Sequence, residues 1–215
     1  MDQMNHYLSI VRPGIEMIYF FSSVLIAIAA VIALRQIEIL KTTLRVQSKR
    51  DALKLTSDQC CIYMSEIITL QNIFHKAVKD NSVKYFEGWN CEIKNNQISL
   101  SRITPPDTEG MKEVLHSLSV LNRMESFSSF FISNVADELV AYDTVGITYL
   151  NFVRYVLPWV LSCRKSGYYK NIVSLFILWE TRRLNQELNK KKESLEKELS
   201  EMNFSSPQPI GVEDI

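Results

Sequence analysis

The pattern of apolar and polar residues divides the chain into a long apolar stretch, a basic stretch and a series of amphipathic segments. Residues 17–34 carry no charge. At an α-helical rise of about 1.5 Å per residue they would extend about 27 Å, close to the hydrocarbon core of a bilayer at about 30 Å. We therefore predict a membrane-spanning helix with these anchor residues: Met17, Tyr19, Phe20, Phe21, Leu25, Ile28, Ile32 and Leu34.

Basic residues follow this stretch and set its expected orientation. Residues 35–54 contain six basic residues against Glu38 and Asp51, and the topology determinants are Arg35, Lys41, Arg45, Lys49 and Arg50. The positive-inside rule predicts a short N-terminus outside and a cytoplasmic chain after residue 34. A cleaved signal peptide is the main alternative. It is disfavoured because such signals carry their positive charge before the apolar run, where only Arg12 stands.

The remaining chain is predicted to be a helical domain with one small β element. Residues 35–57 lack glycine and proline and continue as a basic stalk helix, and 58–183 form a cytoplasmic helical domain. Separate helices are expected over 58–79, 108–134, 136–146, 147–163 and from 168 onward. The segment "WNCEIKNNQISLSRI" alternates in part around two asparagines, which predicts a hairpin near 88–104. The expected fold class is mainly α: a transmembrane helix, a long stalk helix and a helical bundle with a small hairpin. The transmembrane helix begins at Pro13-Gly14.

Residues 147–163 are apolar nearly all round, and two interpretations stay open. A second membrane span would place Arg154 near its middle. Insertion scales assign a central arginine a cost of about 2.5–3.5 kcal/mol. A helix buried between other helices explains the same pattern without this cost and is the favoured reading.

The last helix changes character at Glu180. Before this residue the helix is apolar. Over 184–202 a narrow stripe of apolar residues lies among charged ones. We interpret this part as a protruding helix or weak coiled coil whose candidate partner-binding residues are Leu184, Leu188, Leu195 and Leu199. Residues 203–215 contain two prolines and little apolar bulk, so a disordered tail is expected.

Composition and motifs point away from catalysis. The 24 basic residues balance the 24 acidic ones, so no net field favours nucleic acid. Phosphate-loop, dinucleotide, zinc-protease and serine-hydrolase motifs are absent from the sequence, and its three histidines are widely separated. Its four cysteines lack zinc-site spacing and fit reduced thiols. We expect no catalytic residue, metal or cofactor, no specific nucleic-acid binding, and no enzymatic activity.

A few charged residues fall on otherwise apolar helix faces. Glu125 lies on the apolar face of its helix. Arg154 and Arg164 lie on the apolar face of a later helix. A buried carboxylate needs a partner, since desolvation without one costs several kcal/mol. We therefore predict an ion pair between Glu125 and Arg154 or Arg164. Either it fixes helix register or it forms a ligand or switch site.

The segment 121–183 resembles a family of bacterial membrane-anchored proteins of unknown function, over roughly residues 15–183. The matching residues are Leu121, Asn122, Glu125, Asp137, Glu138, Trp159, Arg164, Tyr168 and Trp179. The resemblance implies an anchored helical domain in the bacterial inner membrane and brings no catalytic residues. The architecture is also similar to membrane effectors of retron-type anti-phage systems, a likeness of architecture and not of motif.

Three functions are considered. The first is a non-enzymatic effector acting on the inner membrane, as the toxic arm of an anti-phage (abortive infection) system controlled by a partner. The second is a membrane-tethered adapter that recruits a cytoplasmic partner. The third, least favoured, is an enzyme with an unfamiliar site at Glu125, Asp137, Glu138 and Arg164. The expected partners are the bilayer and a protein, either a different chain or further copies of this one.

Overall fold

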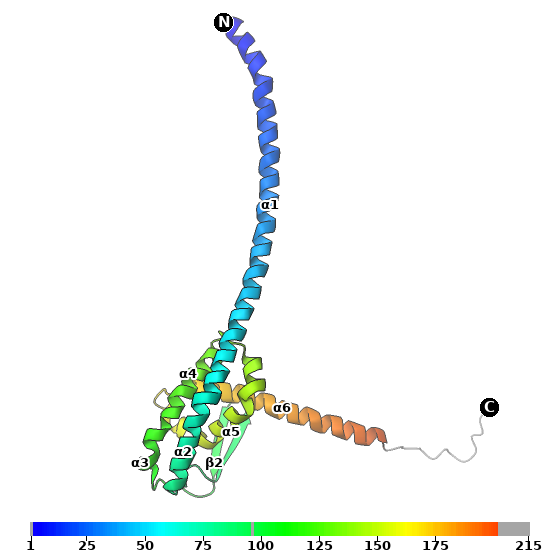
Figure 1. Cartoon of the computed structure of the whole chain (residues 1–215). Coiled ribbons are helices and arrows are strands. Elements are labelled where there is room, and N and C mark those ends of the chain that lie inside the picture. The colour runs from blue at the N-terminus through cyan, green and yellow to red at the C-terminus, as the bar shows by residue number, and fades with distance from the viewer. Residues whose placement is uncertain (1, 96, 202–215) are drawn as a thin grey trace, which may run out of the picture. The chain divides into compact units, whose positions relative to one another are not determined.

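The computed structural model describes residues 2–95 and 97–201, with side chains from Arg12 onward. It is 79% helical and contains one small antiparallel sheet, which confirms the predicted fold class (Figure 1). The chain divides into two compact units after Ala52. The predicted disordered tail, 203–215, lies outside the described residues.

The first unit is the N-terminal part of helix α1, Asp2–Ile62. Of the described helices, this one is long and apolar enough to cross a membrane by length and composition. Its described side chains are all exposed as far as Asp51. The predicted start at Pro13-Gly14 is wrong, because α1 begins at Asp2 with Pro13 inside it. A proline removes one amide donor, but its fixed φ is itself compatible with an α-helix.

The second unit begins with the last two to three turns of α1, which enter a core. The helical path continues through a π-helical turn, Tyr63–Ile67, into α2, Ile68–Asp80. The expected new helix start at residue 58 is therefore wrong. No glycine or proline interrupts this stretch, and the π turn holds the extra residue while Tyr63 and Ile67 stay buried.

The next helices differ from prediction at their ends. A short helix α3, Met111–Val114, leads through a 3₁₀ turn, Leu115–Ser119, into α4, Val120–Ile132. The two helices expected on either side of Gly146 are one helix, α5, Glu138–Arg164. Asp137 caps its start by accepting a hydrogen bond from the Val140 amide at 3.1 Å.

The predicted hairpin is confirmed. Strands β1, Trp89–Lys94, and β2, Gln97–Arg102, pair antiparallel with Ile93 opposite Ile98 and Cys91 opposite Leu100. These four side chains are partly buried against the core. An isolated two-stranded hairpin is only marginally stable in water. Packing on the helices therefore supplies much of its stability.

The core lies between α4, α5 and the first half of α6, Lys170–Glu201. Trp179 of α6 is fully buried, with ring centroids 4.8 Å from Tyr149 and 5.8 Å from Tyr142. Residues of the possible second span are also buried, among them Val153, Val156 and Leu157 at 0% exposure. The structure thus accounts for the apolar stretch 147–163 by burial between helices.

The glycine within α5 is explained by its neighbour. Gly146 is buried, and a Cβ at this position would lie 2.8 Å from Cδ2 of the Tyr142 ring. That ring also lies 4.8 Å from the Arg182 guanidinium. A glycine in mid-helix costs about 1 kcal/mol relative to alanine, but here it gives the ring its position.

We expect Gly146→Ala to destabilise the chain by about 1 kcal/mol, because displacing Tyr142 outweighs the gain in helix propensity. Urea unfolding of the detergent-solubilised protein, followed by tryptophan fluorescence, measures this. In a Tyr142→Ala background the same substitution should instead stabilise by up to about 1 kcal/mol. The same sign in both backgrounds would refute the steric explanation.

Candidate functional site

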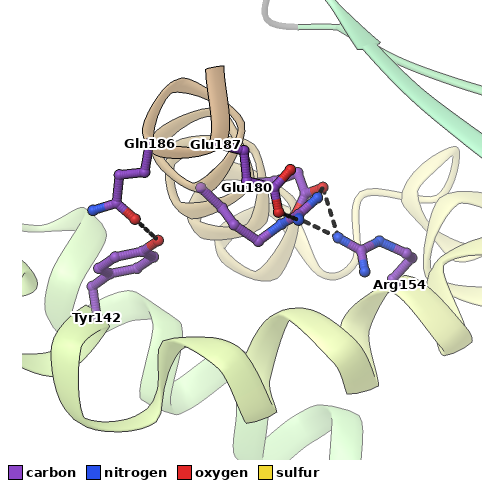
Figure 2. Close-up of polar contacts among 6 residues, drawn as sticks. Tyr142, Arg154, Glu180, Gln186 and Glu187 are labelled. Carbon is purple, nitrogen blue, oxygen red and sulfur yellow. Dashed lines mark hydrogen bonds and ion pairs between the residues drawn. The ribbon is translucent and has the colours of Figure 1, made fainter. Parts of the chain in front are cut away.

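A network of charged side chains lies between α5 and α6, centred on Glu180. The Glu180 carboxylate is 6% exposed. Arg154 of α5 donates from Nη2 to both carboxylate oxygens at 2.6 Å, and Arg183 donates from Nε at 3.0 Å and from Nη2 at 2.7 Å. Figure 2 shows Arg154 pointing from α5 toward Glu180. Two arginines thus share one buried carboxylate.

The electrostatics of this network favour the ionised carboxylate. Burial alone would raise the pKa of the Glu180 carboxyl, but the hydrogen bonds and charges of Arg183 and Arg154 outweigh it and lower that pKa. The hydrogen bond to Glu180 raises the pKa of Arg183 in turn. Arg183 also bonds to Glu187, one turn further along α6. A carboxylate held ionised by two arginines is a poor proton donor or acceptor near neutral pH.

A second carboxylate fastens the start of α5 to α6. Glu138 accepts hydrogen bonds from Nη1 and Nη2 of Arg182, both at 2.7 Å, and one from the Trp179 indole. Tyr142 donates to the Gln186 side chain at 3.1 Å, and Figure 2 shows these two residues pointing toward one another. The bidentate pairing of Arg182 with Glu138 fixes the rotation of α6 against α5.

The predicted ion pair of Glu125 with Arg154 or Arg164 is wrong. Glu125 of α4 accepts hydrogen bonds from the amides of Asn171 and Ile172 at 3.0 and 2.9 Å, and from Asn171 Nδ2 at 3.0 Å. These amides open α6, so Glu125 caps that helix from a neighbouring helix. The residue before α6, Tyr169, has a positive φ of 58° and no side-chain group suited to capping.

The residues considered for an unfamiliar active site do not meet. Asp137 and Glu138 lie at the start of α5, and Arg164 is exposed in its last turn. Along 26 residues of helix, Glu138 and Arg164 are about 39 Å apart. Glu125 accepts a hydrogen bond from a backbone amide at the start of α6. The four residues therefore form no common site.

Open surfaces of the described second unit include the following two. One is a groove of about 360 Å³ beside the turn that joins α5 to α6, lined in part by His116, Trp159 and Tyr168. The other is the outer part of α6, where the candidate partner-binding leucines lie: Leu184 is half-buried, while Leu188, Leu195 and Leu199 are 62%, 59% and 68% exposed. Within the described residues, no three His, Cys, Asp or Glu side chains are placed to hold a metal ion.

Comparison with known proteins identifies a family. The sequence model of a domain of unknown function (DUF4760) matches residues 20–179, well over half of the chain. The chain belongs to this family. The expected range of 15–183 agrees with this match. Comparisons with curated proteins and with solved structures find no match.

Sequence reasoning missed Glu180 as the centre of the polar network. The signal was available, because Glu180 follows Ile172, Val173, Phe176 and Trp179 on a face that proves to be buried. The sequence pattern indicated that the core ended at Glu180, and it did not indicate that Glu180 itself belongs to the core. Arg154 was correctly singled out as polar on an apolar line, but its partner is on α6 and not α4.

We expect Glu180→Gln to lower the free energy of unfolding by about 2–3 kcal/mol, less than for a fully buried pair because both arginines reach solvent. Glu187→Gln is the matched control, since Glu187 also bonds to Arg183 but its side chain is 51% exposed. Its effect should stay below about 0.5 kcal/mol. Urea unfolding at pH 7 compares the two, and equal effects would contradict a central role for Glu180.

The lowered pKa of Glu180 predicts that part of the stability of the fold is lost in acid. Because folding lowers this pKa, the stabilisation is complete above the ordinary carboxyl value, about 4.3, and is lost as the pH falls through the folded value. The difference in unfolding free energy between the native chain and Glu180→Gln should therefore shrink as the pH falls from 6 to 3. A constant difference would contradict this assignment.

Glu125→Ala should cost about 1–2 kcal/mol, because the buried Ile172 amide at the start of α6 loses its acceptor. Arg164→Ala removes an exposed side chain and should change stability by less than about 0.5 kcal/mol. Thermal unfolding of both variants tests the corrected roles. Equal losses would restore the original pairing hypothesis.

Proposed function

We propose that this chain is a single-pass protein of a bacterial inner membrane, anchored by residues 17–34 of α1. The observation that carries the proposal is the exposure of the apolar side chains of this stretch, such as Phe20 at 68% and Ile26 at 69%. Exposing this apolar surface to water costs about 25 cal/mol of free energy per Å². A bilayer removes that cost.

The polar groups of the anchor fit a lipid environment. Ser22 and Ser23 donate their hydroxyl hydrogens to the carbonyls of Ile18 and Phe20 in the same helix, at 2.8 and 2.7 Å. Such internal bonding is what a hydrocarbon core requires. Glu16, just before the anchor, accepts a hydrogen bond from Arg12 at 2.9 Å, which neutralises its charge at the interface.

The proposed orientation places the N-terminus outside and the second unit in the cytoplasm. Arg35, Lys41, Arg45, Lys49 and Arg50 follow the anchor directly and are all exposed. Basic residues within about 15–20 residues of a span favour the cytoplasmic side.

We propose that the protein acts as a non-enzymatic effector on that membrane under the control of a protein partner. Glu125, Glu138 and Glu180 each hold arginine, tryptophan or amide donors, an arrangement that supports a structural role over catalysis. The exposed leucines of outer α6 supply a surface for the partner. The anti-phage role rests on the architectural likeness described above.

The second candidate is a membrane-tethered adapter. The same leucines favour it, since a protruding amphipathic helix commonly docks in a partner's groove. An adapter would be harmless when expressed and would co-purify with a stable partner. An effector would disturb the membrane once its partner is absent.

Induced expression without other genes of its locus tests the effector proposal. We expect depolarisation and growth arrest from the full-length chain, read with a potential-sensitive dye. Ala27→Arg with Ala29→Arg adds about 2.5–3.5 kcal/mol per arginine to insertion and should abolish the effect. Ala27→Leu with Ala29→Leu, the matched control, should keep it. Normal potential at verified membrane expression of the full-length chain would contradict the effector and favour the adapter.

A further inference from the structure

The aqueous part of the α1 helix carries apolar side chains that nothing in its own unit covers. Ile37, Leu40 and Leu44 are 49%, 58% and 55% exposed. At about 1.5 Å per residue, Leu44 lies about 15 Å beyond Leu34. Headgroups extend only about 5–8 Å beyond the hydrocarbon on each side. Lipid therefore cannot cover Leu44.

These residues continue a regular line that begins inside the anchor. Spacings of three and four residues alternate along the α1 seam, defined here as Ile26, Ala30, Ala33, Ile37, Leu40 and Leu44. Alternating three-and-four spacing is the period of a left-handed coiled coil. The two alanines occupy the membrane part, where small side chains allow close helix approach.

We propose that the α1 seam pairs with the α1 seam of a second copy of this chain, forming a parallel, in-register two-helix coiled coil. The inference rests on the proposed membrane anchoring, because two copies inserted with the same topology are necessarily parallel. In register, each seam residue meets its own equivalent across the pair. The pairing covers the apolar side chains that lipid does not reach.

Charge along the helix supports a second copy as the occupant. No seam position carries a charge. By the roughly 100° helical period, Arg35 and Lys49 lie on the opposite side of the helix and Arg45 lies to the side. The one charge flanking the seam is Lys41. In a parallel pair it stands opposite the uncharged amide of Gln36 from the second copy.

The seam has a defined end. Its next two positions after Leu44 are Gln47 and Asp51, and two copies of Asp51 would place like charges against each other. From Leu55 onward α1 instead packs one face into the core of the second unit, through Leu55 and Cys60. The proposed pairing thus covers Ile26 to Leu44 and stops before the helical domain begins.

Cysteine cross-linking in membranes tests the pairing on the full-length chain. Leu40→Cys and Leu44→Cys lie on the seam. Ile39→Cys and Val46→Cys are matched controls, also exposed and apolar, at 66% and 48% exposure, but on another face. We expect mild oxidation to give several-fold more disulfide-linked dimer from the seam variants than from the controls, above the background of the parent chain with its four native cysteines.

A second pair of variants asks whether the seam drives the association. Leu40→Asp should remove the cross-link formed through Leu44→Cys, whereas Ile39→Asp should leave it. Carbonate extraction of the same membranes reports anchoring separately. An anchored chain with equal cross-linking on both faces, with none, or with a band of another mass would overturn the pairing and leave the anchor standing. A chain extracted from the membrane would overturn the proposed anchoring and the pairing together.

Discussion

The helical domain depends on how the first half of α6 is fastened to α4 and α5 through carboxylates. Glu125 of α4 receives the opening amides of α6, Glu138 of α5 receives Trp179 and Arg182, and Glu180 of α6 receives Arg154 of α5. Each contact fixes a different degree of freedom, namely the start of the helix, its rotation and its distance from α5. Trp179, whose indole donates to Glu138, is completely buried among aromatic rings.

The same arrangement explains why α6 has two halves. As far as Glu180 one face of the helix is buried in the domain, at Ile172, Val173, Leu175, Phe176, Trp179 and Glu180. Beyond the polar network the side chains are exposed, and i,i+4 pairs such as Lys192–Glu196 stabilise the helix locally. Figure 1 shows this half of α6 standing clear of the other labelled helices of its unit. The exposed leucines of this half are the basis on which a protein partner is proposed for either function.

Helix α1 must satisfy a different constraint. Helix α1 carries an apolar stretch and then a basic stretch, and the helical path continues past its end at Ile62 into the buried residue Tyr63, without a glycine or proline between residues 35 and 80. Burial raises the pKa of Tyr63 to about 12, and its hydroxyl accepts a hydrogen bond from Gln71 at 3.0 Å. The π turn that starts at Tyr63 lets the helix keep this residue buried and still present Phe74 to the core. The proposed α1 seam pairing would place a second copy of the helix beside the apolar side chains of this stretch.

The sequence by itself determined the features that depend on local composition and period: the apolar candidate span, the mainly α fold class, the hairpin and the change in α6 after Glu180. These follow from short-range physics, since hydrophobic length, helical period and turn residues are visible within a window of about 20 residues. Only the tertiary structure decided which charge meets which. Arg154 was recognisable as a polar residue on an apolar line, but its choice of Glu180 over Glu125 depends on helix rotation, which no local pattern encodes. The merging of two expected helices into α5 has a local origin instead: Gly146 was expected to end a helix, but the Tyr142 ring four residues earlier fills the space where its Cβ would lie.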